Sequence, residues 1–160
     1  VPCSAKHVDL ILHTIDRLEA SGGSDLDRPL WKLAEASRKK GIMVLISDLY
    51  EPPQKALESI RRLGFKGNDL IVFHLLDRAE IDFPFEEAAN YQDMESGETI
   101  PVLPDHLRER YREMVAEHIE ALEKAFGQNR IDYELIDTSQ PLDHALFDYL
   151  TRRARATRIR

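Results

Sequence analysis

The N-terminal segment carries apolar side chains at the spacing of one helix face. After Ser4, which can cap a helix, the apolar positions recur every three or four residues, at Val8, Ile11, Leu12, Ile15 and Leu18. The stretch Ser21-Gly22-Gly23 predicts the end of this helix and a loop. A second helix is expected between that loop and Gly41.

An unbroken apolar run, Ile42 to Ile46, and a second segment, Leu70 to Leu76, in which His74 is the one polar residue, predict strands of a different kind. Runs of this type are typical of strands buried on both faces, as in a parallel sheet that helices cover. Between them, Pro52-Pro53 predicts the start of a helix that continues to about Leu63. Strand, helix and strand form a βαβ unit, for which we expect a right-handed crossover.

The residues from about 83 to 102 are predicted to form an insertion. Two short extended segments flank Ser96-Gly97, which is typical of a β-hairpin with a glycine turn. Further elements are expected after it: a long helix from about His106 to Phe126, an edge strand from Ile131 to Ile136 and a helix from Leu142 to Leu150. The fold class is therefore α/β.

The hairpin needs an anchor, because a two-stranded ribbon alone is only marginally stable. Phe83 and Phe85 flank Pro84, and we expect both rings to pack inward. Tyr91 and Ile100 are expected to face the domain. This arrangement leaves the acidic side chains exposed, namely Asp93, Glu95 and Glu98.

Composition narrows the classes of function. The chain has 160 residues, of which 42% are hydrophobic and 32% charged, so we expect one soluble globular domain. Its 29 acidic residues exceed its 22 basic ones, which argues against a broad nucleic-acid surface. Cys3 is the only cysteine, and neither a membrane span nor a signal peptide is apparent. We therefore expect a cytoplasmic location.

Four motifs, in this order, suggest a family. They are Leu45-Ile46-Ser47-Asp48, Phe83-Pro84-Phe85, Asp93-Met94-Glu95-Ser96-Gly97-Glu98 and Asp137-Thr138-Ser139-Gln140-Pro141-Leu142. The set resembles the C-terminal part of the bacterial family called domain of unknown function 58. The resemblance implies a Rossmann-like von Willebrand factor A-type three-layer sheet, present in part over residues 1–160. It also implies a non-enzymatic protein-interaction module whose partner is a MoxR-type AAA+ ATPase.

The resemblance further implies a metal-ion-dependent adhesion site built from three loops. The first loop, Asp-x-Ser-x-Ser, does not occur in this sequence. Ser24 matches the second loop, with serine in place of threonine, and Asp48 matches the third. An intact parent domain would bind Mg²⁺ through such residues, whereas one carboxylate and one hydroxyl give only a weak site. We expect no cofactor in this fragment. The alternative for Ser47 and Asp48 is capping of the following turn.

An alternative function is a Mg²⁺-dependent hydrolase that uses Asp48 and Asp77 as paired carboxylates. The nearby loops offer Glu51 but no convincing histidine as a general base, so we favour binding over catalysis. His74 lies within an apolar strand, where a hydrogen-bonded core residue is expected rather than a metal ligand.

Two features predict contacts with other chains. The resemblance implies that this chain lacks the first strands of the domain. Their absence would leave one edge of the Ile42–Ile46 strand unpaired and favour dimers or larger species. The tail from Arg152 to Arg160 carries five arginines in nine residues. It could contact an acidic partner or a membrane surface, or it could simply be a helix C-terminus that cations favour.

Overall fold

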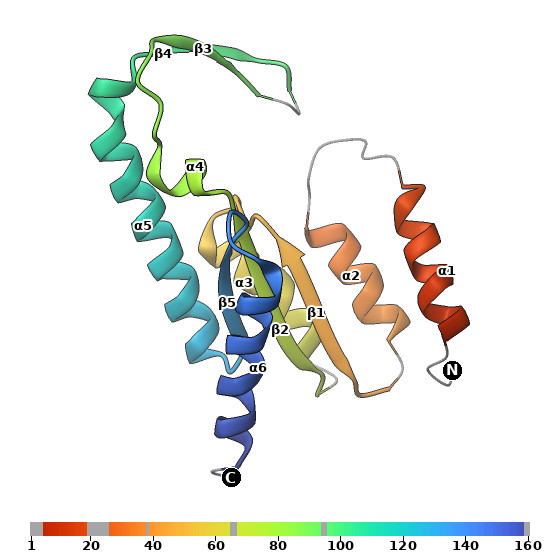
Figure 1. Ribbon diagram of the computed structural model, residues 1–160. Helices are drawn as coiled ribbons and strands as arrows, with labels where there is room; N and C mark the ends of the chain where they lie inside the picture. Colours follow the sequence, from red (N-terminus) through yellow and green to blue (C-terminus); the bar gives the residue numbers. More distant parts are fainter. Residues whose placement is uncertain (1–4, 19–25, 38, 65–66, 94–95, 159–160) are drawn as a thin grey trace.

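The computed structural model describes residues 5–18, 26–37, 39–64, 67–93 and 96–158, without the side chains of 155–158. In chain order the elements are α1 (Ala5–Asp16), α2 (Asp27–Ala36), β1 (Ile42–Ser47), α3 (Pro53–Gly64), β2 (Asp69–Leu76), α4 (Arg78–Asp82), β3 (Ala89–Gln92), β4 (Thr99–Val102), α5 (Pro104–Gln128), β5 (Asp132–Asp137) and α6 (Leu142–Arg158) (Figure 1). The short α4 was not predicted. Among these helices, none combines the length and apolar character that crossing a lipid bilayer requires.

A parallel sheet in the order β1-β2-β5 forms the centre of the fold. Successive side chains of β2 point to opposite faces, as strand geometry requires. Leu70 and Val72 pack in a core with α2, α3 and α5, while Ile71 and Phe73 pack with α6, where Tyr149 meets Phe73 edge to face. Helices therefore cover the sheet on both sides, and the predicted α/β class and the two-sided burial of β2 are confirmed (Figure 1).

The prediction that β1 is buried on both faces is wrong. Its residues alternate, and Ile42, Val44 and Ile46 are 64%, 51% and 63% exposed. These side chains lie on the same face of the sheet as the β2 residues that α6 covers. The cluster buried beneath α6, however, contains no residue of β1. One edge of β1 is also unpaired in the described sheet, as expected, and β5 is the other edge strand. We call Ile42, Val44 and Ile46 the open face.

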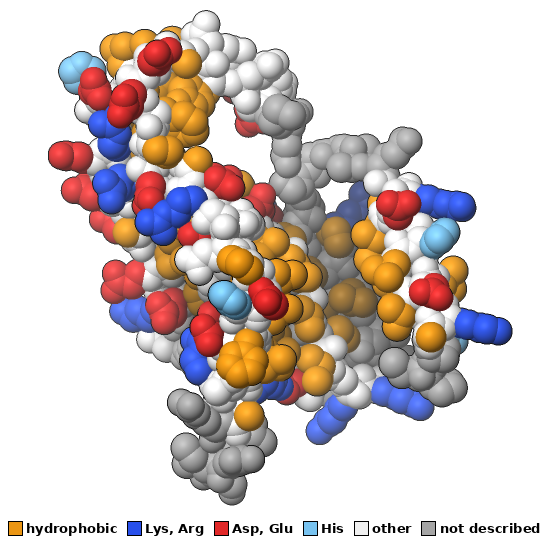
Figure 2. All heavy atoms as spheres, in the orientation of Figure 1, with side chains coloured by type: hydrophobic (Ala, Val, Ile, Leu, Met, Phe, Trp, Pro, Cys, Tyr) orange, Lys and Arg blue, Asp and Glu red, His pale blue; other side chains and the backbone are white. Residues whose placement is uncertain are grey.

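The apolar stripe of α1 is exposed as well. None of its residues is buried, and its large apolar side chains are about half or more exposed. Figure 2 shows hydrophobic side chains over the part of the sheet that β1 occupies and on the side of α1 toward the sheet. The sequence pattern predicted the helix, but within the described chain its apolar face has no core to join.

Aromatic rings anchor the hairpin to the start of α5. Phe83 is buried and contacts Phe85, Tyr91 and Tyr111, with ring centroids 4.8–6.1 Å apart. The inward packing of Phe83 and the inward orientation of Tyr91 are therefore confirmed. Phe85 joins the cluster but is 40% exposed. Ile100 was expected to face the domain; it lies opposite Tyr91 in the hairpin, but it belongs to neither buried core cluster and is exposed.

A basic side chain that sequence reasoning did not single out fastens the same loop. The guanidinium of Arg108, on α5, donates hydrogen bonds to the carbonyls of Phe83 and Phe85, at 3.3 and 2.7 Å. Phe83 has a left-handed backbone, with φ of 46°. The expected glycine turn is also present, since Gly97 has φ of 74° and donates from its N–H to the Asp93 carbonyl.

The C-terminal arginines are partly explained by contacts within the chain. Arg152 pairs with Glu134 of β5, and Arg153 pairs with Asp132 and Asp69 at the ends of two strands. For these two residues the structure favours the interpretation that they stabilise the C-terminal helix through ion pairs within the chain. The side chains from Arg155 onward lie outside the described residues.

Asp27 joins α2 to α3. Its carboxylate accepts hydrogen bonds from the Ser59 hydroxyl at 2.8 Å and from Arg62 at 2.6 Å. These hydrogen bonds, that from Ser59 first, hold the pKa of Asp27 below its usual value of 3.8. A carboxyl group whose pKa is lower in the folded state stabilises the fold above its unfolded pKa. That contribution is lost as pH falls through the folded pKa.

We expect Asp27→Asn to lower the free energy of unfolding near neutral pH, because the neutral amide does not attract Arg62 as the carboxylate does. The difference between the two proteins should be constant from roughly pH 7 to 5 and should shrink below about pH 4. Urea unfolding across this range measures it, with Asp16→Asn on exposed α1 as the control. A difference that does not change with pH would contradict the role given to the charge.

Candidate functional site

The predicted residues Asp48 and Asp77 lie at the carboxyl end of the parallel sheet, where open α/β sheets bind their ligands. Asp48 follows β1, Asp77 follows β2, and Asp137 ends β5. The register of the strands determines how these residues are offset along the sheet. Ser47 lies opposite His74, and Leu76 lies opposite Asp137. Asp77 therefore stands about two residues farther along the sheet than Asp48, an offset of roughly 6–7 Å in addition to the strand spacing.

Two histidines hold the backbone that follows β1. Nε2 of His74 and Nε2 of His118 donate hydrogen bonds, each of 2.8 Å, to the carbonyls of Asp48 and Leu49 respectively. Leu49 is 1% exposed and has a left-handed backbone, with φ of 48°. Non-glycine residues adopt this region rarely, and the surrounding contacts must hold them there. The two imidazoles supply such contacts to consecutive peptide groups.

His74 is a hydrogen-bonded core residue, as predicted. It is fully buried, and its Nδ1 lies 2.7 Å from the hydroxyl of Tyr133. Because Nε2 must donate to a carbonyl, the neutral ring accepts at Nδ1 from the Tyr133 hydroxyl. Burial lowers the pKa of His74, which favours this neutral form. Both ring nitrogens therefore have structural partners.

The side chains next to Asp48 stabilise the turn. The hydroxyl of Ser47 accepts from the N–H of Leu49 at 3.2 Å and donates to the Asp48 carboxylate at 3.4 Å. Asp48 itself is exposed. Glu51 accepts from the N–H of Leu26 at 3.2 Å, which ties this loop to the start of α2. Its other carboxylate oxygen is buried, and no described group hydrogen-bonds to it.

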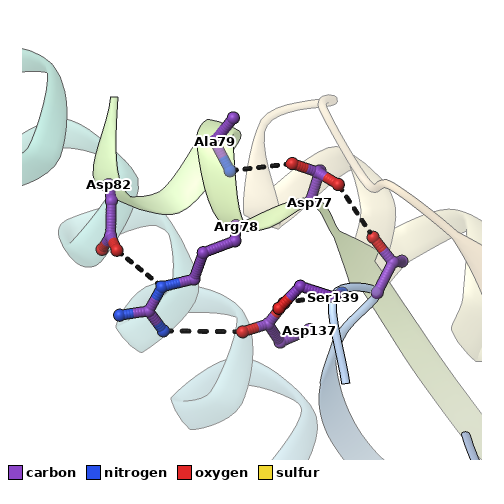
Figure 3. A network of polar contacts seen from close by, with 7 residues as sticks. Asp77, Arg78, Ala79, Asp82, Asp137 and Ser139 are labelled. Atoms are coloured by element: carbon purple, nitrogen blue, oxygen red, sulfur yellow. Dashed lines mark hydrogen bonds and ion pairs between the residues drawn. The ribbon is translucent and has the colours of Figure 1, made fainter. Parts of the chain in front are cut away.

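Asp77 caps the N-terminus of α4. One of its carboxylate oxygens accepts from the N–H of Ala79 at 2.8 Å, and the other accepts from the Thr138 hydroxyl at 3.3 Å. Glu80 completes the capping box by accepting from the N–H of Asp77. Figure 3 shows that Asp77 points to α4 and to the loop after β5.

Arg78 and Asp137 complete the polar network of Figure 3. Arg78 contacts Asp82 at 2.5 Å and Asp137 at 3.5 Å. Ser139 donates to Asp137 from both its hydroxyl, at 2.6 Å, and its N–H, at 2.9 Å. These bonds, with a smaller contribution from Arg78, keep the pKa of Asp137 below its usual range. The network stabilises the loop after β5.

A cavity of about 260 Å³ lies between these strand ends and α5. Its apolar wall consists of Leu76, Met114 and Val115. Two carboxylates, two tyrosines and two histidines complete the lining: Asp48, Glu80, Tyr50, Tyr111, His74 and His118. Sequence reasoning missed this cavity, because its residues come from two strand ends, a short helix and a long helix with no shared motif. The only signal was the helical spacing of Tyr111, Met114, Val115 and His118.

The described residues do not fit a magnesium centre. Mg²⁺ requires several oxygen ligands, and the described chain contains no group of three or more His, Cys, Asp or Glu side chains that could hold a metal. Asp77 and Ser47 are occupied by the hydrogen bonds above. Ser24, the other predicted ligand, lies outside the described residues.

Comparison with protein families identifies the chain. The model of the family described as "Protein of unknown function DUF58" matches residues 2–121. The chain belongs to the DUF58 family. The match includes β1, β2, the hairpin and most of α5, whereas β5 and α6 lie beyond it. No curated protein and no solved structure matches the chain.

We expect this DUF58 chain to bind Mg²⁺ weakly or not at all, because Asp48 belongs to no cluster of metal-binding side chains among the described residues. Isothermal titration calorimetry with MgCl₂ tests this, with Asp48→Ala as the variant. A dissociation constant in the low micromolar range that Asp48→Ala abolishes would overturn the expectation. That result would mean that Asp48 forms a complete site with residues outside the described chain, such as Ser24.

Proposed function

We propose that this chain is a non-enzymatic protein-interaction module that binds through the free edge of β1 and the open face. The observation that carries the proposal is that three large apolar side chains lie exposed beside an unpaired strand edge. Such an edge presents main-chain donors and acceptors in the spacing that another strand requires. Contiguous exposed apolar surface of this kind commonly marks an interaction site.

We interpret the sheet as part of a von Willebrand A-type, Rossmann-like domain over residues 1–160. The parallel order β1-β2-β5 with helices on both faces is compatible with this fold. In this interpretation, the free edge of β1 is the position where a further strand, of the same protein or of a partner, pairs. Fold alone does not define function, so the proposal depends on the exposed surface.

The groups at the strand ends support binding rather than catalysis. His74 uses both ring nitrogens, and Asp77 uses both carboxylate oxygens, in bonds that hold loops. A hydrolase that pairs Asp48 with Asp77 would need both carboxylates at one point, whereas the register separates them along the sheet. No observation favours that alternative, and we do not propose it.

The partner that we propose is a MoxR-type AAA+ ATPase in the cytoplasm, in accordance with the family resemblance. The hairpin of β3 and β4 offers the contact. Asp93 and Glu98 are exposed at its turn, and Glu95, which lies outside the described residues, adds a third acidic residue in the sequence. A ribbon of this charge suits a basic surface on the ATPase.

We expect the chain to self-associate when no partner is present, because a second copy can pair with β1 and cover the open face. Light scattering over a wide concentration range should show dimers or larger species. Val44→Lys should shift the distribution toward monomer, since a charge on the open face opposes its burial. Leu107→Lys, at an exposed α5 position outside the cavity, is the matched control. A clean monomer at every concentration would count against the proposal.

Deletion of the hairpin tests the ATPase contact. We expect removal of Asn90–Thr99, with the ends joined by glycine, to weaken binding to a MoxR-type ATPase while the main sheet still forms. Biolayer interferometry measures the binding, and thermal unfolding measures stability. Asp93→Asn with Glu98→Gln is a milder variant that keeps the hairpin. Unchanged binding together with a large fall in melting temperature would leave the hairpin with a structural role only.

A further inference from the structure

The cavity beside Asp48 has hydrogen-bonding capacity that the fold does not use. Nε2 of His118 donates to the Leu49 carbonyl, and no described residue hydrogen-bonds to its Nδ1, which is the acceptor nitrogen of that tautomer. The Asp48 carboxylate accepts only the long contact from Ser47 within the described chain. The Tyr111 hydroxyl has no described partner. The capacity that remains is therefore mostly for accepting hydrogen bonds.

The charge of the lining has one sign. Asp48 and Glu80 are carboxylates, and neither Lys nor Arg lines the cavity. Glu80 accepts from the Tyr50 hydroxyl with one oxygen and from the Asp77 N–H with the other. Burial and the charge of Glu80 raise the pKa of Tyr111, so this hydroxyl remains neutral. A cation is thus the complementary ligand, and its N–H donors would meet the unused acceptors.

The body of the ligand must be hydrocarbon. Leu76, Met114 and Val115 form the apolar wall of the cavity that the carboxylates also line. The volume, about 260 Å³, is slightly below the range typical of pockets for drug-sized molecules, roughly 300–1,000 Å³. A single long side chain, with an apolar stem and a charged end, suits this space better than a cofactor does.

The two tyrosines of the cavity indicate whether its ligand is an arginine or a lysine side chain. Tyr50 and Tyr111 line the same cavity as the carboxylates. A planar guanidinium stacks on aromatic rings and donates several hydrogen bonds in a fixed fork, whereas an ammonium is a compact and strongly hydrated charge. Arginine therefore matches the combination of rings, carboxylates and a ring-nitrogen acceptor more closely than lysine does.

We propose that the cavity between α5 and the carboxyl ends of β1 and β2 binds an arginine side chain of a protein partner. Its stem lies against Leu76, Met114 and Val115, and its guanidinium meets Asp48, Glu80 and His118. This inference rests on the proposed function, because it names the partner chemistry that an interaction module would recognise at the end of the sheet. It needs no metal and is independent of the open face.

The test uses blocked amino acids on the whole chain. N-acetyl-L-arginine methylamide is titrated into the ¹⁵N-labelled protein, and amide chemical shifts are followed by NMR. We expect saturable shifts at lining residues with a dissociation constant on the order of millimolar, as suits one side chain. The citrulline analogue, which has almost the same shape but no charge, should bind at least about tenfold more weakly, because it lacks the charge-assisted hydrogen bonds.

Variants place the binding in the cavity. Met114→Trp, at a half-exposed position of α5, should fill the space and abolish the shifts, and the dispersion of the same spectra reports whether the variant is folded. Glu80→Gln should weaken binding roughly fivefold or more through loss of charge. Glu113→Gln makes the same chemical change on α5 outside this cavity and should leave the affinity unchanged.

The outcomes separate this inference from the proposed function. The absence of shifts at lining residues, equal affinity for the citrulline analogue, or full binding to a folded Met114→Trp variant would each overturn the arginine site. If self-association and ATPase binding behave as expected in that case, the interaction module remains. If the arginine probe binds as expected while those two tests fail, the site stands and the proposed function falls.

Discussion

Both other strands of the main sheet are paired to β2, so the burial of this one strand supports everything else. Leu70 and Val72 join the core with α3 and α5, and Ile71 and Phe73 join the core with α6. A polar residue, His74, lies fully buried at the same level of the strand as the end of β1. Leaving a buried polar group unpaired would cost roughly 1–3 kcal/mol, so its partners matter to the whole fold.

The way in which His74 is satisfied links the core to the carboxyl end of the sheet. Its ring connects Tyr133 of β5 to the backbone that follows β1, and His118 of α5 holds the next peptide group. Three elements, β2, β5 and α5, thus hold the loop that follows β1 and carries Asp48. Two imidazoles hold the loop, and that of His74 is fully buried. This explains how Leu49 keeps a left-handed backbone without glycine.

Coverage of the sheet is unequal, and the exposed surface follows from that inequality. The helix α6 covers β2 and β5 on one side but leaves the open face of β1 uncovered, and α1 exposes its own apolar stripe. The hairpin shows the contrasting case, because a cluster of four aromatic rings and Arg108 attach it to α5. The surfaces that we propose for binding are therefore distinct: an apolar strand edge, an acidic ribbon and a small anionic cavity.

The sequence by itself determined those features that depend on neighbours along the chain. The apolar run of β2, the helix after Pro53, the glycine turn at Gly97 and the burial of His74 all follow from local pattern and residue chemistry. Membership of the DUF58 family could also be predicted from the sequence, through motifs at recognisable intervals.

Only the tertiary structure decided features that depend on contact between distant segments. The runs of β1 and β2 look alike in sequence, yet only β2 has strands on both sides and a helix over each face. Asp48 and Asp77 both end strands, but the register offsets them. Likewise Glu80, Tyr111 and His118 border one cavity although no motif joins them. Pattern records how apolar a segment is, whereas burial and proximity depend on what the rest of the chain places against it.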